Sequence, residues 1–264
     1  MMRRWIRTAG KWTVRGLLLL VLLVAIDIAI LAFPNVLFAH KQTFDEFTVY
    51  SNQPLPGGYG QVIDGVRERI EAMENARPGA DCRVYVCDSQ RLFSFFAFLT
   101  RRSSDSMAIC LSAFNSVYMN EEKIGRIAAH NYGGIRHCRF EGDYAEVIAH
   151  EIVHINVVKS AGYWKAIKMP FWKSEGYAEY QANIAPARAD SSYFFTDRID
   201  LLMDTAFWGG DESIARRLYE WHILVEYLAE EKGYGLEELY DETVTELSTR
   251  REMLAWYDER RAQR

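Results

Sequence analysis

Two histidines and a glutamate stand close together in the stretch AEVIAHEIVHINVVKS, residues 145–160. His150 and His154 are four residues apart, so on a helix both imidazoles project from the same face and can reach one point in space. A hydrolytic zinc ion needs three protein ligands and an open position for water. Glu151 is placed to act on that water as a general base. For the pair of histidines alone, polar side chains satisfied within a helix are the alternative interpretation.

A third ligand is offered by PFWKSEGYAEY, residues 170–180. We expect Ser174 to cap a second helix, on which Glu175 and Glu179 lie four residues apart on one face. Glu175 can complete the ligand set, and Glu179 can hydrogen-bond a ligand histidine and fix its tautomer. Alone, two glutamates on a helix usually indicate a solvated face. Beside HEIVH they favour a site for one zinc ion.

The two motifs together resemble those of the gluzincin zinc metallopeptidases, the thermolysin-like and aminopeptidase-like group with an HExxH motif followed by an EGxAEY-type helix. Here HEIVH is followed by WKSEGYAEY, with twenty residues between His154 and Glu175. The resemblance covers about residues 143–182. It implies zinc ligation by His150, His154 and Glu175, catalysis by Glu151, and support of a ligand by Glu179. The metzincin pattern is excluded, because residues 157 and 160 are valine and serine rather than glycine and histidine.

The resemblance also implies a zincin-like fold and two further parts of the site. An edge strand before the zinc helix should hold an extended peptide by main-chain hydrogen bonds, and some segment of residues 107–140 should correspond to it. A tyrosine or histidine on a later helix should stabilise the oxyanion. Residues 217–235 resemble that helix, and Tyr219 and His222 are the candidates. Ordinary packing is the alternative for both.

These residues must be positioned by strands and helices, and strand-like segments come before helical ones along the chain. This order predicts an α+β fold, a small mixed or antiparallel sheet followed by a helical lobe with the zinc site between them. An apolar stripe predicts a helix over residues 61–75. Segments rich in β-branched and aromatic residues predict strands over 83–87, 92–99 and 107–114, with a weaker candidate over 135–140. Further helices are expected from Asp143, as N-cap, to about residue 159, then over 174–182, 212–232 and from 236 into the tail.

The N-terminus predicts a membrane segment. Five basic and no acidic side chains fall within residues 1–15, and eighteen residues, GLLLLVLLVAIDIAILAF, follow at 16–33. At about 1.5 Å per residue this run spans roughly 27 Å, close to the thickness of a bilayer core. We predict an uncleaved single-pass signal-anchor over 16–38 with the basic end in the cytoplasm. A cleaved signal peptide is the alternative. Asp27, within the span, either contacts a transmembrane partner or is protonated or hydrated on a single helix.

The predicted organisation is a cytoplasmic basic segment (1–15), the transmembrane anchor (16–38), a linker (39–60) and an extracytoplasmic zincin-like domain (61–264), periplasmic if the protein is bacterial. The chain has 31 basic and 36 acidic residues, and five of the basic ones precede the anchor, so the outer domain is acidic. An acidic domain argues against a nucleic-acid partner.

The four cysteines, Cys82, Cys87, Cys110 and Cys138, all fall in the outer part, where disulfides are permitted. Three pairings, or free thiols, stay open. If CRVYVC forms one strand, Cys82 and Cys87 point to opposite faces and cannot be bridged to each other.

From these patterns we predict a membrane-anchored zinc metallopeptidase that hydrolyses a peptide or protein substrate with zinc-activated water. Two alternatives stay open: a catalytically inactive gluzincin-like binding or scaffold protein, and a zinc hydrolase of a non-peptide substrate.

Overall fold

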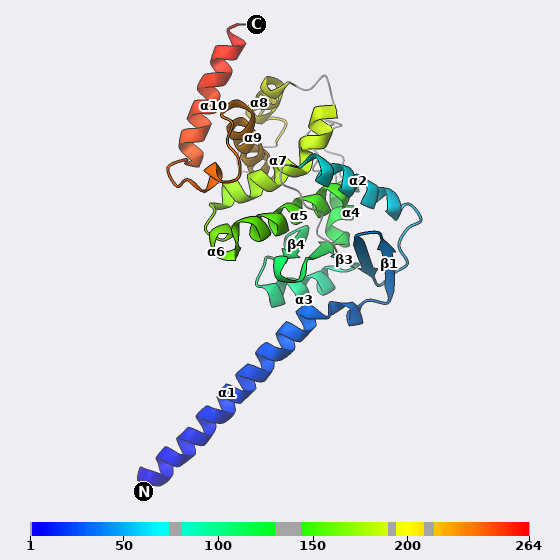
Figure 1. The fold of residues 1–264 in the computed structure, drawn as a ribbon, viewed down its shortest axis with the longest axis vertical. Helices are drawn as coiled ribbons and strands as arrows, with labels where there is room; N and C mark the ends of the chain where they lie inside the picture. The colour runs from blue at the N-terminus through cyan, green and yellow to red at the C-terminus, as the bar shows by residue number, and fades with distance from the viewer. Residues whose placement is uncertain (1, 74–80, 130–143, 190–193, 209–213, 264) are drawn as a thin grey trace.

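The structure is a computed structural model that describes residues 2–73, 81–129, 144–189, 194–208 and 214–263. A long N-terminal helix leads into an α+β domain (Figure 1). The strands are β1 (His40–Phe44), β2 (Phe47–Ser51), β3 (Cys82–Cys87), β4 (Ala108–Leu111) and β5 (Ser116–Asn120). The α-helices are α1 (Met2–Ala32), α2 (Tyr59–Ala72), α3 (Gln90–Thr100), α4 (Glu121–Ala129), α5 (Tyr144–Ala161), α6 (Tyr163–Ala166), α7 (Phe171–Ala189), α8 (Phe195–Met203), α9 (Ile214–Glu226) and α10 (Glu246–Arg261). Shorter helical turns are η1 (Pro34–Leu37), η2 (Ser112–Phe114), η3 (Tyr227–Glu231) and η4 (Glu238–Tyr240).

The sheet is mixed, as predicted. Its strand order is β1-β2-β3-β5-β4, with β2, β3 and β5 parallel and the two outer pairs antiparallel. Within the described part of the chain β4 therefore forms one edge. Residues 40–51 were expected to belong to a linker, but they form β1 and β2 and pair into the sheet. The sheet thus includes part of the segment assigned to the linker, and β5 was not predicted.

Side chains alternate across β3, so each face of the sheet has its own apolar cluster. Val84 and Val86 pack with α2 and α5 on one face, whereas Tyr85 packs with α3 on the other. Cys82 and Cys87 likewise fall in different clusters, as the strand interpretation requires. Both are free thiols, and so is Cys110. Cys138 lies outside the described residues, as does the weak strand candidate over 135–140.

The strand predicted over residues 92–99 is wrong, because this segment lies within α3. The Ser89 side chain caps the helix by accepting a hydrogen bond from the backbone N–H of Leu92. Phe93, Phe96 and Ala97 are buried with helical spacing. Aromatic side chains favour strands on average, but packing one face of this segment onto the sheet overrides that preference. The strand predicted over 107–114 is shorter than expected and ends where η2 begins.

Most of the later helices lie close to their predicted positions. Two starts differ. The helix predicted from residue 236 begins only at Glu246, as α10, after the short turn η4. Helix α7 begins at Phe171, so Ser174 is an internal helical residue and not the cap. The backbone N–H of Ser174 donates to the carbonyl of Pro170, 3.0 Å away. Asp143, the predicted cap of α5, lies outside the described residues. The helix predicted over 212–232 appears as α9 continued by the π-helical turn η3, and Gly233 follows with a positive φ of 71°.

Within α1, residues 14–32 are long and apolar enough to span a membrane, a criterion that a signal sequence also meets. The span is shorter than the predicted 16–38 at its C-terminal end. The helix stops at Ala32, and η1 follows with Pro34 at its start. Phe38 is buried in the domain, where its ring packs against Tyr85 and Phe96 at centroid distances of 5.2 and 6.1 Å. The first core residue of the domain therefore lies six residues after α1.

Candidate metal centre

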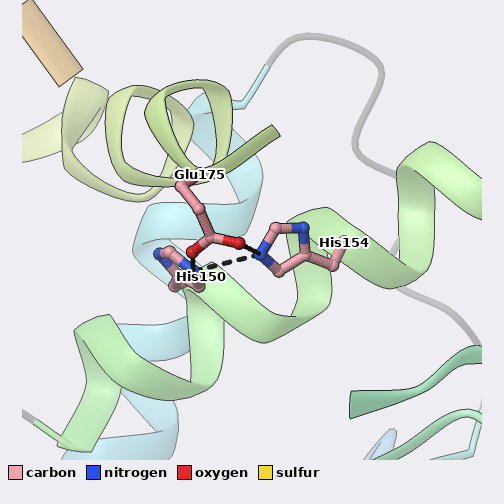
Figure 2. Close-up of side chains that lie close together, drawn as sticks. All are labelled: His150, His154 and Glu175. Atoms are coloured by element: carbon pink, nitrogen blue, oxygen red, sulfur yellow. Dashed lines mark hydrogen bonds and ion pairs between the residues drawn. The ribbon is translucent and has the colours of Figure 1, made fainter. Parts of the chain in front are cut away.

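Helices α5 and α7 bring the candidate ligands together (Figure 2). Apolar residues cover most of α5, which is held between the sheet and α7 by Ile148, Ile152 and Ile155. This burial fixes the helix while leaving the His150 and His154 side chains directed toward α7. Glu175 reaches them from the first turns of α7.

The three side chains converge on one point. The Nε2 atoms of His150 and His154 are 3.1 Å apart. One carboxylate oxygen of Glu175 lies 3.5 Å from Nε2 of His150, and the other lies 3.5 Å from Nε2 of His154. These residues form a group that could hold a metal ion. The three side chains keep between 13 and 20% of their surface exposed, so solvent can reach the group.

Glu179 accepts a hydrogen bond from one of the two histidines. Its Oε1 lies 3.1 Å from Nδ1 of His150, which donates to it. A neutral His150 with its proton on Nδ1 leaves Nε2 as a bare acceptor, directed at His154 and Glu175. Imidazole ligands of metal ions are typically oriented in this way by a carboxylate. The contact between Glu179 and His150 is thus present, and the role of Glu179 in orienting a metal ligand stays a prediction.

The electrostatics of the group favour a cation. Burial would raise the pKa of Glu175, but the hydrogen bond from His150 and the charge of His154 outweigh it and lower the pKa to about 2. Burial would lower the pKa of His150, but Glu179 and Glu175 raise it well above its usual value. Burial lowers the pKa of His154 to about 4, although Glu175 acts in the opposite direction. His150 thus lies protonated between two ionised carboxylates, those of Glu175 and Glu179. A metal ion bound to Nε2 of His150 would displace the proton from that atom.

Glu151 is buried one residue along α5, and its neighbour on the sheet was not anticipated. Burial raises the pKa of Glu151. The thiol of Cys110, on β4, acts on it in the opposite direction, while burial and the charge of Glu151 raise the pKa of the thiol. From the sequence, Cys110 was considered only for disulfide pairing. Its place within the predicted strand 107–114, in the region 107–140 expected to supply an edge strand, was the signal that could have linked it to the site.

Arg102 is a second residue that the sequence interpretation missed. It follows α3 in the segment leading to β4, and its side chain is exposed. Its positive charge acts on Glu151, His154 and Glu175, although in each case burial is the larger influence on the pKa. Its place in the loop before the predicted strand 107–114 was the signal available. A fixed cation therefore lies within electrostatic range of the group.

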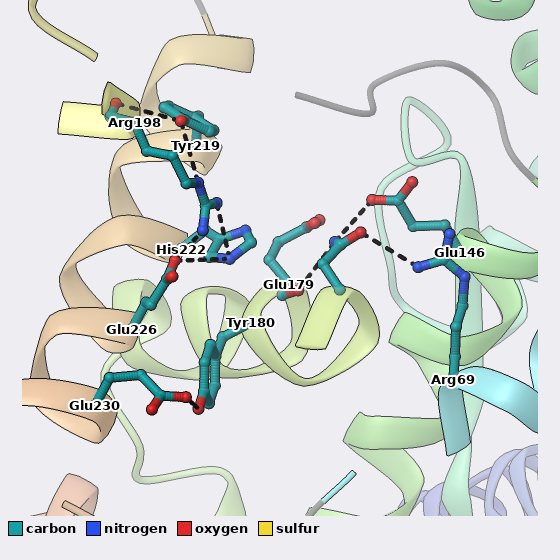
Figure 3. A network of polar contacts seen from close by, with 10 residues as sticks. Arg69, Glu146, Glu179, Tyr180, Arg198, Tyr219, His222, Glu226 and Glu230 are labelled. Carbon is teal, nitrogen blue, oxygen red and sulfur yellow. Dashed lines mark hydrogen bonds and ion pairs between the residues drawn. The ribbon is translucent and has the colours of Figure 1, made fainter. Parts of the chain in front are cut away.

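Tyr219 and His222 lie outside the group of three and bind Arg198 of α8 instead (Figure 3). The Tyr219 hydroxyl donates to the backbone oxygen of Arg198, 3.3 Å away. Nε2 of His222 accepts from Nη2 of Arg198 at 3.1 Å, and Arg198 also forms a buried ion pair with Glu226. Burial and the charge of Arg198 lower the pKa of His222. The oxyanion role assigned to Tyr219 and His222 stays a prediction.

Polar contacts near the C-terminal half of α7 hold it against α5 and α2. The amide of Asn183 donates to Oε1 of Glu146 at 2.9 Å and to the backbone oxygen of Glu179 at 3.0 Å. Arg69 of α2 donates to the backbone oxygen of Ala182 at 2.6 Å. These contacts join three helices around the turn that carries Glu179 (Figure 3). They restrict how far Glu179 can move from His150.

The described site can thus do two things chemically: gather three donor atoms around a cation, and present a buried carboxylate, Glu151, one residue from a ligand. Comparison with known proteins adds no assignment. No protein-family model matches the chain, and no match was found among curated proteins.

Proposed function

We propose that the protein is a membrane-anchored zinc metallopeptidase that hydrolyses peptide bonds in a peptide or protein substrate. The observation that carries this proposal is the convergence of the donor atoms of His150, His154 and Glu175, with Glu151 beside them. Two imidazoles and one carboxylate are a common ligand set of catalytic zinc, which keeps a fourth position for water.

The distances between donor atoms fit this ion. Ligands at 2.0–2.1 Å from a tetrahedral zinc ion lie about 3.3–3.4 Å from one another. The separation of the two ring nitrogens, 3.1 Å, and the two nitrogen–oxygen separations of 3.5 Å lie on either side of that value. A zinc ion held there would lower the pKa of water from 15.7 to about 7.

The chain's own residues supply the remaining chemistry. Glu151 accepts the proton of the attacking water and later delivers it to the leaving amine. Burial raises the pKa of Glu151, which makes it a stronger base toward the water than an exposed glutamate. Glu179 holds His150 in the ligating tautomer. Tyr219 or His222 would help to stabilise the oxyanion after turning away from Arg198.

The sheet provides a place for the substrate. Within the described residues β4 pairs with β5 on one side only, so its other edge can hydrogen-bond an extended peptide. Cys110 lies on this strand and influences the pKa of Glu151, which supports a substrate strand on β4 that runs past the general base. The gluzincin resemblance implies such an edge strand within residues 107–140.

The membrane arrangement belongs to the same proposal. Residues 1–15 would stay in the cytoplasm, α1 would remain as an uncleaved anchor, and the domain would lie outside, in the periplasm of a bacterium. The basic side chains before the apolar run support this orientation. Asp27 would face either a transmembrane partner or water.

The test uses the full-length protein in detergent, with metal analysis and a peptide-library digest with and without chelator. Glu151→Gln should keep its zinc and lose about 10²–10⁴-fold in activity. Glu175→Ala should lose zinc as well as activity. As a matched control, Glu71→Gln changes an exposed carboxylate on α2 and should do neither.

Equal zinc content and equal activity in all these proteins would refute the proposal. Bound zinc without cleavage of any peptide would favour the scaffold or non-peptide hydrolase alternatives instead.

A further inference from the structure

Two helices of the domain carry large apolar side chains that no described residue covers. On α3, Phe98 is 78% exposed and Phe95 is also exposed. On α6 and just after it, Trp164 is 75% exposed, and Tyr163 and Ile167 are exposed beside it. We name these five residues the docking face. Exposed apolar groups of this kind typically mark an interaction surface.

The outer side of α3 has the pattern of a helix that lies on a membrane. Its inner side, with Phe93 and Phe96, packs onto the sheet. Its outer side carries Phe95 and Phe98 at helical spacing, where an ordinary surface helix would carry polar residues. Exposed arginines stand at both ends of the helix, at positions 91, 101 and 102. An apolar stripe with basic flanks suits the headgroup region of a bilayer.

Contacts place α3 beside the end of α1 and connect the region before α6 to it. Ile30 and Leu31 pack against the apolar cluster to which α3 contributes. Arg83 donates to the backbone oxygen of Ala32, at the end of α1, and to that of Phe114 in η2.

The next residue after η2, Asn115, accepts from Lys159 at 2.8 Å, near the end of α5, and α6 follows directly. Figure 1 shows α3 where α1 joins the domain, and α6 on the flank toward which α1 slants.

The connection between α1 and the domain is too short to let the domain swing freely. Only the four residues of η1 separate the end of α1 from Phe38, apart from Phe33, and Phe38 is buried against Tyr85 and Phe96. A short tether gives the docking face a high effective concentration at any bilayer that holds α1.

We propose that the docking face enters the headgroup region of the bilayer that α1 spans, with the flanking basic side chains near anionic headgroups. Tryptophan, tyrosine and basic residues are the side chains enriched at this depth. The inference depends on the proposed insertion of α1 but not on the metal chemistry. About 10 Å of helix separates His154 from the end of α5, so docking would hold the metal group close to the membrane surface.

The test uses the full-length protein in vesicles of phosphatidylcholine and phosphatidylglycerol, with either ordinary or brominated acyl chains. Bromine quenches tryptophan fluorescence on contact. The contribution of Trp164 is the difference between the wild-type protein and Trp164→Phe, which cancels the tryptophans within α1. We expect this contribution to be quenched by brominated lipid, more strongly when the bromine lies near the headgroups.

Two variants sharpen the test. Phe98→Asp should abolish most of the quenching of Trp164, although the two residues lie on different helices. Leu247→Asp places the same charge at an exposed leucine of α10, far from α1 in Figure 1, and should leave the quenching unchanged. Both positions are exposed, so both variants should keep the wild-type circular dichroism.

Each remaining outcome overturns the inference. Vesicles that float with the protein but leave Trp164 unquenched would show insertion of α1 without docking. Protection of Trp164 from aqueous iodide as well, with a dimer in detergent, would assign the face to a second copy of the chain. Failure of the protein to float would remove the membrane insertion on which docking depends, while leaving the metal chemistry untouched.

Discussion

Two groups of histidine and glutamate, one half-buried and one buried, lie in the described part of this domain, and they differ in what balances their charge. In the group on α5 and α7, the Nε2 atoms of His150 and His154 face each other and Glu175. In the group on α8 and α9, His222 and Glu226 have a similar four-residue spacing, but a guanidinium group from Arg198 contacts both. The second group carries its own cation.

The difference teaches why only one of the two groups is a candidate metal centre. A metal ion needs nitrogen and oxygen lone pairs that nothing else uses. Nε2 of His222 already accepts a hydrogen bond from Arg198. Among the described residues, no lysine or arginine forms an ion pair with Glu175 or Glu179, which instead contact histidines. The same residue types therefore give a structural network in one place and a cation site in the other.

The largest effect on folding stability should come from removing the guanidinium group of Arg198, the cation of the second group. Arg198→Ala would leave Glu226 buried and uncompensated, a change that typically costs about 3–5 kcal/mol of folding stability. Denaturant unfolding of the full-length protein in detergent measures this cost. Metal content, measured on the folded protein, should stay at the wild-type level.

The matched control for Arg198→Ala is the double variant Arg198→Met with Glu226→Leu, which removes both charges. It should recover most of the lost stability, because apolar pairs often replace buried ion pairs without loss. A variant Arg198→Ala that keeps its stability but loses its metal would show that the two groups are not separate.

The next effect is on metal affinity. Glu175→Ala removes a ligand and should weaken metal binding by more than the roughly 10–100-fold that loss of an outer-sphere partner costs. Glu226→Ala removes a more deeply buried glutamate from the second group and should leave metal affinity unchanged. Titration of the chelator-treated proteins with zinc, followed by calorimetry, compares the two. Similar affinities for both variants would contradict the contrast drawn between the groups.

The sequence predicted the metal group more fully than the fold around it. The four-residue spacings of His150 with His154 and of Glu175 with Glu179 are local, so a helix converts them directly into shared faces. What brings α5 to α7 is long-range packing, which the resemblance to a known pattern supplied and the local spacing did not. The α+β class followed from the order of strand-like and helical segments.

The sequence misled where tertiary contacts override local preference. Residues 92–99 are rich in phenylalanine, and their aromatic content suggested a strand, but one side of the segment packs on the sheet as α3. His222 looked available on an amphipathic helix because the partner that engages it, Arg198, lies 24 residues earlier on α8. No periodicity within α9 reveals a partner on another helix.

Loss of the outer-sphere carboxylate should have a smaller effect than loss of a ligand. Glu179→Ala removes the acceptor of the His150 Nδ1 proton, which lies 3.1 Å away, while all three candidate ligands stay in place. Zinc affinity should fall by about 10–100-fold. Glu179→Gln keeps an acceptor oxygen without its charge and should fall between the alanine variant and the wild type. Wild-type affinity in both variants would mean that Glu179 does not orient His150.

The smallest effect should come from a change at Gly176, where α7, which carries Glu175, packs against α9, which carries His222. The quantity affected is the stability of the fold. A Cβ atom at this position would lie 2.8 Å from Cγ2 of Val225 and closer still to the backbone oxygen of Trp221. Overpacking of this kind costs about 1–3 kcal/mol, from which the better helix propensity of alanine recovers at most about 1 kcal/mol. Gly125→Ala on α4, with no heavy atom within 4 Å of the added methyl, is the control and should be neutral or stabilising.

Thermal unfolding with and without zinc then separates two possibilities for Gly176→Ala. If α9 moves away as a unit, its own network with Arg198 stays intact and only the contact between the helices is lost, so the loss of stability is equal in both conditions. If α7 shifts instead, Glu175 moves with it, and stabilisation by zinc falls because binding to the folded state weakens. The loss of stability caused by Gly176→Ala is therefore compared with and without zinc. The difference between the two values measures how rigidly the network on α9 holds the metal ligands in place.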